Sequence, residues 1–107
     1  MADPSQLNRA PGAPSLAQVR SVRAELLRAA ALHGLGNIRV FGSVARDDAD
    51  AGSDVDLLVH PGENTSLFDL AGFMIAAEEL LGTTVDVVSD RGRSEVLDRI
   101  LAEAIPL

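Results

Sequence analysis

The chain has 107 residues, a formal net charge of −7 and a hydrophobic fraction of 47% with only 3% aromatic residues. This length supports one small domain with an aliphatic core, and the negative charge argues against direct binding to nucleic-acid phosphates. The absence of cysteine excludes disulfides and thiolate metal sites, and since all nine cations are arginine, a P-loop lysine is excluded as well.

Residues 1–14 contain three prolines and little apolar content, so we predict a flexible N-terminal tail followed by one domain over residues 15–107. No apolar stretch reaches the length of a membrane span, and no basic segment followed by an apolar one opens the chain. We therefore expect a cytoplasmic protein without membrane association.

The first half of the domain reads as a helix, a strand and a polar loop. Ser15, with Gln18 three positions later, forms a capping-box start, apolar residues follow at helical spacing, and Gly34 is a C-terminal stop. Residues 38–41 are typical of a short strand, and the Gly- and Asp-rich residues 45–53 of a loop with at most one helical turn.

The second half alternates strands with helices. Residues 54–59 and 83–89 are typical of strands, residues 65–81 predict a helix between them, and Ser94 caps a last helix. The order is α-β-β-α-β-α. This order predicts an α/β (α+β) fold, a small mixed β-sheet backed by helices.

Asp54 and Asp56 open the second predicted strand in the run Asp-Val-Asp-Leu-Leu-Val. The two-residue period of a strand places both carboxylates on one face. Such carboxylates are costly to bury unless a cation compensates them, and a pair of metal ions would do so. A second Asp-x-Asp, Asp48 with Asp50, lies in the polar loop, where no strand orients it, and is interpreted as solvated turn residues.

Asp86 lies alone among apolar residues of the third predicted strand. By itself it is equally well explained as an edge-strand residue that faces solvent. On a sheet shared with Asp54 and Asp56, it becomes a third carboxylate at the same site. Carboxylates from two strands in this arrangement can hold two Mg²⁺ ions.

Gly42 and Ser43 lie ahead of Asp54, and ten residues separate Ser43 from that aspartate. Glycine lets the backbone approach a phosphate closely, and the serine hydroxyl with nearby N–H groups can bind the β- and γ-phosphates of a nucleoside triphosphate. Arg46 follows and is either a phosphate contact or a surface residue. The combination suits nucleotidyl transfer, in which an acceptor hydroxyl attacks the α-phosphate and pyrophosphate leaves.

Three segments carry a resemblance to a known superfamily: Gly-Ser-x10-Asp-x-Asp over 42–56, the run 85–88 and the C-terminal residues 100–107. They resemble the nucleotidyltransferases of DNA polymerase β palm type and, more narrowly, the minimal nucleotidyltransferase (MNT) antitoxins that partner HEPN ribonuclease toxins. The resemblance covers residues 38–107 and the preceding helix. Asp47 departs from it, since relatives often have glycine after Ala-Arg.

The resemblance implies a polymerase β palm-like fold and an Mg²⁺-dependent antitoxin. Such an enzyme transfers AMP from ATP to a tyrosine of its HEPN toxin, with which it forms a hetero-oligomer. Asp86 would also activate the acceptor hydroxyl. The site residues are then Gly42, Ser43 and Arg46 for the nucleotide, and Asp54, Asp56 and Asp86 for the two Mg²⁺ ions and catalysis.

Residues 67–81 are apolar nearly all round the predicted helix, with only Asp69, Glu78 and Glu79 clearly polar. A domain of this size can hardly cover every side of such a helix, so we predict a partner surface, with a toxin or in a homodimer. Ordinary exposed apolar area is the alternative.

Two other functions remain open. An antitoxin can neutralise its toxin by stoichiometric binding without catalysis, although binding alone does not need the residues of a nucleotidyltransferase site. A transferase can also act on a small-molecule hydroxyl, but enzymes of that kind usually carry a second, helical domain.

Overall fold

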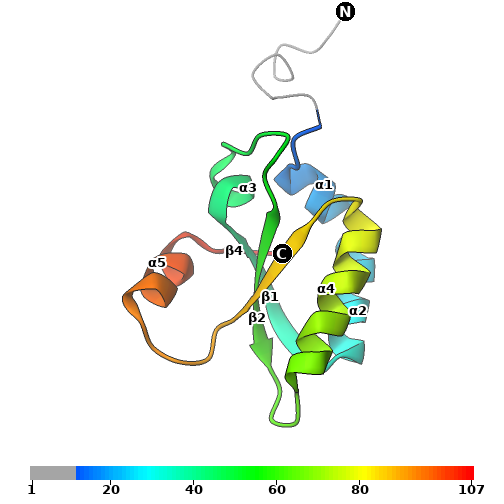
Figure 1. Cartoon of the computed structure of the whole chain (residues 1–107), viewed down its shortest axis with the longest axis vertical. Coiled ribbons are helices and arrows are strands. Elements are labelled where there is room, and N and C mark those ends of the chain that lie inside the picture. Colours follow the sequence, from blue (N-terminus) through cyan, green and yellow to red (C-terminus); the bar gives the residue numbers. More distant parts are fainter. Residues whose placement is uncertain (1–11) are drawn as a thin grey trace, which may run out of the picture.

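A computed structural model describes residues 12–107, so residues 1–11 of the predicted N-terminal tail lie outside the described part of the chain. Two consecutive helices open this part of the chain, and strands and helices alternate after them (Figure 1). Their bounds are α1 (Leu16–Ser21), α2 (Arg23–Leu32), β1 (Leu35–Phe41), α3 (Gly42–Arg46), β2 (Val55–Pro61), α4 (Leu67–Leu81), β3 (Val85–Ser89), α5 (Glu95–Glu103) and β4 (Ile105–Pro106).

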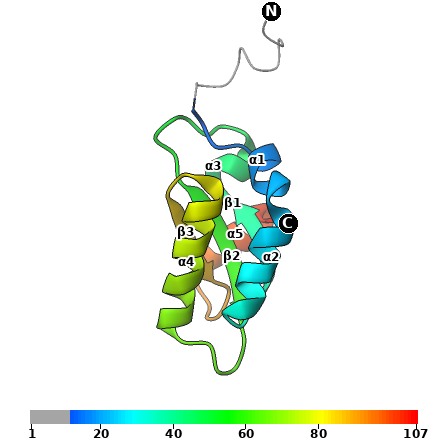
Figure 2. The same ribbon diagram turned by 90° about the vertical axis from the view of Figure 1, so that its right-hand side faces the viewer.

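The four strands form one mixed sheet in the order β3-β2-β1-β4, which confirms the predicted fold class. β1 pairs antiparallel with both β2 and β4, whereas β2 and β3 are parallel. Parallel strands need a crossover, and α4 supplies it. Figure 2 shows α2 and α4 on one face of the sheet and α5 on the other.

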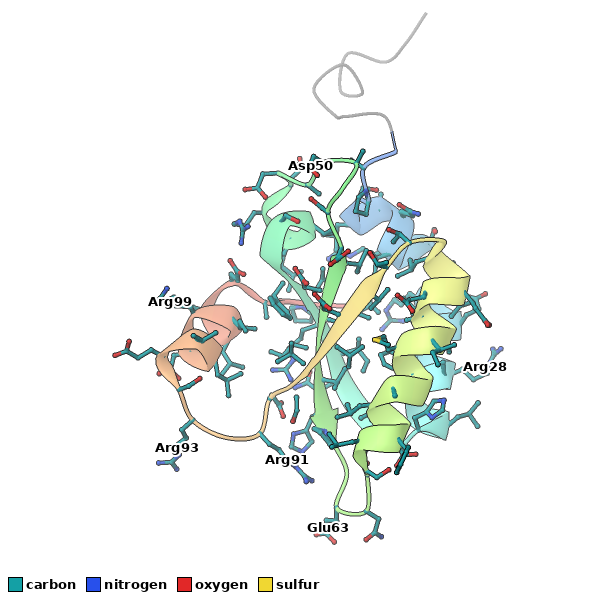
Figure 3. The ribbon with its side chains drawn as sticks, in the orientation of Figure 1. Arg28, Asp50, Glu63, Arg91, Arg93 and Arg99 are labelled. Atoms are coloured by element: carbon teal, nitrogen blue, oxygen red, sulfur yellow. The ribbon has the colours of Figure 1, made fainter. Side chains whose placement is uncertain are left out.

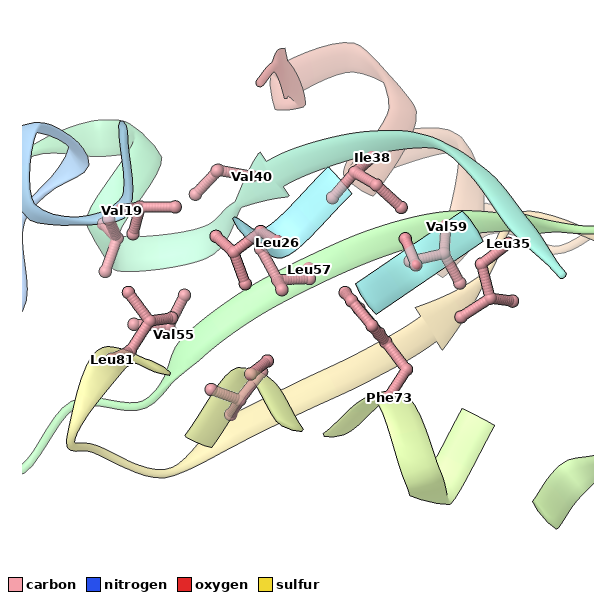
Figure 4. Close-up of a cluster of buried hydrophobic side chains, with 14 residues drawn as sticks. Val19, Leu26, Leu35, Ile38, Val40, Val55, Leu57, Val59, Phe73 and Leu81 are labelled. Atoms are coloured by element: carbon pink, nitrogen blue, oxygen red, sulfur yellow. The ribbon is translucent and has the colours of Figure 1, made fainter. Parts of the chain in front are cut away.

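The main core lies between the sheet and the helices α1, α2 and α4. Because side chains alternate along a strand, Val55, Leu57 and Val59 of β2 all point into this layer and are fully buried. Phe73 of α4 and Leu26 of α2 meet them from the helical side (Figure 4). The other face of β2 is left for a smaller cluster under α5 and for the polar residues described below.

The prediction of a single helix up to Gly34 is wrong, because the segment forms two helices, α1 and α2. Val22 ends α1 with φ −114° and ψ 24°, and α2 begins at the next residue. The Ser15 cap is present, since the Ser15 hydroxyl accepts the N–H of Gln18, but only this half of the predicted capping box is seen, because the Gln18 side-chain amide donates to the carbonyl of Leu81 at 3.0 Å. Val19 on α1 and Leu26 on α2 are both fully buried against the sheet.

Several further boundaries differ from the sequence prediction, among them the start of β1, which is Leu35 rather than residue 38, and the end of β2, which is Pro61 rather than residue 59. β2 begins at Val55, so Asp54 precedes the strand, and the third strand begins at Val85 rather than at residue 83. The short helix α3 covers Gly42–Arg46 rather than part of 45–53. β4, which was not predicted, has two residues and pairs with the outer edge of β1; two residues are too few for a periodic pattern.

The predicted cap of α5 is present, and α4 is capped at both of its ends. Ser66 and Asp69 form a capping box at the start of α4, Gly82 ends it in the left-handed conformation, and the Ser94 hydroxyl accepts the N–H of Leu97 in α5. No helix within residues 12–107 is both long and apolar enough to cross a membrane.

Candidate active site

Asp56 and Asp86 lie side by side on the sheet face that carries α5. They are register partners across the parallel pair β2–β3, so their Cα atoms are about 5 Å apart. Two residues further along, Leu58 and Val88 point to the same face and pack beneath α5. The two carboxylates therefore stand at the open end of the small cluster, Asp56 half-buried and Asp86 exposed.

Asp54 reaches this end of the sheet from just before β2. It is exposed, and its carboxylate accepts a hydrogen bond from the hydroxyl of Thr84, which just precedes β3. This contact ties the approaches to the two parallel strands together. The sequence did not single out Thr84, because its position follows only from the pairing of β2 with β3.

Gly42 stands beside Asp56, since Phe41 is the register partner of Asp56 on the other side of β2. The chain turns from β1 into α3 at Gly42 with φ +73°, a conformation that L side chains rarely adopt. A Cβ atom added there would overlap Oδ2 of Asp56. Glycine is therefore required twice, once by the backbone and once by the carboxylate.

The first turn of α3 lies beside the end of α5. Ser43 is partly buried in that turn, and Arg46 ends the helix with its side chain half-exposed. Glu103, the last residue of α5, accepts the backbone N–H of Gly42 at 2.9 Å and pairs with Arg46 Nη1 at 3.1 Å. The sequence contains Glu103 in its C-terminal run, but only the packing of α5 beside α3 reveals these contacts.

Asp47 follows α3 as its C-cap, with φ +62°. Glycine adopts this left-handed conformation most readily, and aspartate is among the few other residues that tolerate it. α3 forms with aspartate at this position, so the departure from the family pattern does not prevent the helical turn over Gly42–Arg46.

The second Asp-x-Asp, Asp48 with Asp50, lies in the loop after α3. Asp50 is exposed on the loop between α3 and β2, where its carboxylate accepts the N–H of Gly52 and the hydroxyl of Ser53 (Figure 3). Asp48 is also exposed and pairs with Arg46. Both behave as turn residues, as the sequence indicated.

Burial and neighbouring carboxylates both disfavour the charged form of Asp56. Burial, the nearby Asp86 and then Asp54 raise the pKa of the Asp56 carboxyl from 3.8 to about 6, with Glu103 adding to the shift and Arg46 opposing it. A divalent cation between these carboxylates would relieve that repulsion, and carboxylate oxygens are ligands that Mg²⁺ accepts.

The carboxylates do not yet form a closed metal site. Within residues 12–107, no three carboxylate or imidazole side chains are gathered as a metal site would need. Asp54 is turned toward Thr84. The three carboxylates are ligands of the kind that Mg²⁺ accepts, so the donor set fits Mg²⁺ while the placement of Asp54 does not.

The metal-free protein is expected to become more stable when Asp56 is replaced. Because the folded state raises the pKa of Asp56 from 3.8 to about 6, ionisation of this carboxyl destabilises the fold as pH rises through that window. In EDTA at pH 7.5, Asp56→Asn should gain about 1 kcal/mol, with solvent screening taken into account, which corresponds to a melting temperature about 4–8 °C higher.

Thermal melting of both proteins in EDTA between pH 4 and 7.5 measures this difference. The gain should shrink toward pH 4, and Mg²⁺ should stabilise the wild type more than Asp56→Asn. Asp50→Asn is the matched control. It should change neither the melting temperature in EDTA nor the stabilisation by Mg²⁺. Equal melting temperatures at every pH would contradict the repulsion at Asp56.

The chain is similar in sequence and in structure to known nucleotidyltransferases. The family model described as "Nucleotidyltransferase domain" matches residues 20–104. A candidate protein adenylyltransferase of Methanocaldococcus jannaschii is 36% identical over 88 residues, which cover 81% of this chain and 95% of that protein. A solved structure of a candidate minimal nucleotidyltransferase is 45% identical with a TM-score of 0.78, and the match covers 88% of this chain and 97% of the other.

Two more distant solved structures share the fold. A toxin–antitoxin complex with AMP-PNP matches with a TM-score of 0.65 at 20% identity, over 78% of this chain and 69% of the other. The complex of the tri-AMPylated Shewanella oneidensis HEPN toxin with its MNT antitoxin matches with a TM-score of 0.59 at 21% identity, over 84% and 68%. At these identities the likeness concerns the fold alone.

Proposed function

The chain belongs to the nucleotidyltransferase domain family and is a nucleotidyltransferase, and on that premise we propose that it is an Mg²⁺-dependent antitoxin that transfers AMP from ATP to a tyrosine of a HEPN-type toxin. The observation that carries the proposal is the meeting of Gly42, Asp56 and Asp86 at one end of the sheet. A purely structural protein has no need to hold two aspartates beside a glycine in the left-handed conformation.

The residues of the site divide into two groups. Gly42, Ser43 and Arg46 bind the triphosphate, through backbone N–H groups, a hydroxyl and a guanidinium. Asp54, Asp56 and Asp86 hold Mg²⁺. Bound Mg²⁺ supplies neutralisation of the negative charge on the attacked phosphate and on the leaving pyrophosphate.

The order of the strands supports a direction for the reaction. α3 follows β1, Asp56 lies on β2 and Asp86 on β3, in that spatial order across the sheet. The leaving group therefore lies at α3, and the acceptor approaches from the side of Asp86, as in-line displacement requires. The acceptor oxygen forms a bond to the α-phosphorus, the bond to the β-phosphate oxygen breaks, and Asp86 takes the hydroxyl proton.

A protein acceptor is supported by the M. jannaschii relative, named as a candidate protein adenylyltransferase, and by the surface of α4. Phe73, Ala77 and Leu81 of α4 are buried, but Phe68 is 89% exposed and Leu67 is 82% exposed. Large exposed apolar side chains on one helix are typical of a protein-binding surface. We assign this surface to the toxin, in a hetero-oligomer.

Labelled ATP tests the proposal directly. The protein is incubated with Mg²⁺, the product of the adjacent gene and ATP carrying label at the α- or the γ-phosphate. Transfer of the α-label alone to the partner is the expected result. Transfer of the γ-label would indicate a kinase and overturn the proposal.

Stoichiometric neutralisation without catalysis is the second candidate, and the exposed apolar side chains of α4 favour it. It predicts complex formation with the toxin but no transfer of either label. Full protection of cells by a protein with both Asp54→Ala and Asp56→Ala would decide for this candidate.

A further inference from the structure

Glu103 occupies the groups that the proposed function assigns to phosphate. Its Oε1 accepts the N–H of Gly42 at 2.9 Å, and both of its carboxylate oxygens lie within 3.3 Å of Arg46 Nη1. The carboxylate is thus an anion already bound to the backbone donor and the cation of the phosphate loop. A triphosphate oxygen and this carboxylate cannot both take the same N–H group at full strength.

The surroundings of Glu103 hold its backbone but leave its side chain room to move. α5 is fixed to the sheet through Leu97, which is buried, and the chain continues directly into β4, which pairs with β1. The side chains of Glu103 and Arg46 are 32% and 50% exposed. The carboxylate can therefore leave Gly42 by rotation about its own side-chain bonds, without a shift of α5.

We propose that Glu103 is a positioning residue that stands in for phosphate in the nucleotide-free enzyme. It holds Gly42 and Arg46 in place, and the incoming triphosphate displaces it and takes over both contacts. Arg46 exchanges one anionic partner for another, while the released carboxylate turns to solvent. The inference rests on the proposed function, because it needs a triphosphate at α3.

A consequence follows for affinity. An anion that must be displaced weakens the binding of the anion that replaces it, so Glu103 lowers the affinity for nucleotide. Glutamine at this position keeps the acceptor for the Gly42 N–H and nearly the same volume but loses the charge. We expect Glu103→Gln to bind Mg²⁺–AMP-PNP roughly 3–10-fold more tightly, since hydrogen bonds to a charged acceptor are about twice as strong as neutral ones.

Isothermal titration of Mg²⁺–AMP-PNP into the full chain provides the test. Glu95→Gln is the matched control, because it removes the same charge from the same helix about 12 Å away along the axis, and it should bind like the wild type. In an Arg46→Ala background, the gain from Glu103→Gln should become smaller, because half of the displaced contact is already absent. If Glu103 had only a structural role, Glu103→Gln would not bind Mg²⁺–AMP-PNP more tightly than the wild type.

The outcomes separate this inference from the proposed function. Tighter binding of Mg²⁺–AMP-PNP by Glu103→Gln but not by Glu95→Gln supports the displacement of the Glu103 carboxylate by the triphosphate. Equal or weaker binding by Glu103→Gln, in a protein that melts like the wild type, overturns it and leaves the proposed function standing. Absence of nucleotide binding by the wild type would overturn both.

Discussion

The Asp56→Asn enzyme is expected to transfer nucleotide at least about 10³-fold more slowly than the wild type at saturating Mg²⁺. Metal coordination supplies several kcal/mol of charge stabilisation in the transition state, and about 4 kcal/mol corresponds to this factor. Asp56 is the central carboxylate of the site, between Gly42 and Asp86, so no neighbour can take its place. The rate of α-label transfer to the toxin measures the effect.

Two features make this experiment decisive. Asp56→Asn is expected to raise the stability of the metal-free protein, so a loss of transfer cannot be attributed to unfolding. Asp50→Asn removes a carboxylate from the other Asp-x-Asp, which lies in the exposed loop, and should transfer at the wild-type rate. A transfer rate within about tenfold of wild type for Asp56→Asn would contradict the metal-binding role, given the energies involved.

The Gly42→Ala protein is expected to lose transfer by about 10²-fold, because a displacement of about 1 Å in catalytic geometry has that cost. The added methyl group would overlap the carboxylate of Asp56, so either the loop or the carboxylate must move. The backbone at φ +73° is also strained for alanine, and the free energy of unfolding should fall by about 1–3 kcal/mol. Transfer rates and denaturant unfolding measure the two effects.

Gly82→Ala separates the effect of the overlap with Asp56 from the effect of backbone strain at positive φ. Gly82 has φ +67°, nearly the same backbone conformation, but a Cβ atom there would meet nothing within 4 Å. It should lose a similar amount of stability while it keeps the wild-type transfer rate. If both variants lose transfer equally, the overlap with Asp56 is not the cause.

The candidate site residues Asp56 and Asp86 and the sheet face that carries them were accessible from the sequence, because a face depends on local periodicity. Asp56 and Asp86 each alternate with apolar residues, and the two-residue period of a strand then places both on the face opposite their immediate neighbours. The cap at Ser94 was likewise predicted correctly, since a cap involves residues three positions apart. The same local reasoning rejected Asp48 and Asp50.

Local patterns failed where packing overrides them. The helical spacing of residues 16–30 continues across Val22, yet the chain bends there and forms two helices. Asp54 belongs to the strand pattern, but it precedes β2 and bonds to Thr84. β4 is held by its partner β1 rather than by any pattern of its own.

By itself, the sequence determined the candidate site residues and the kind of domain that carries them: a Gly-Ser pair, three aspartates in or beside apolar runs, and a small aliphatic domain without cysteine or lysine. Only the tertiary structure decided how these parts meet. The register that sets Asp56 beside Asp86, the fit of Gly42 against Asp56 and the reach of Glu103 to Gly42 all join residues distant in sequence. The physical reason is that spacing along a chain sets which way a side chain points, whereas distances between elements are set by strand pairing and core packing.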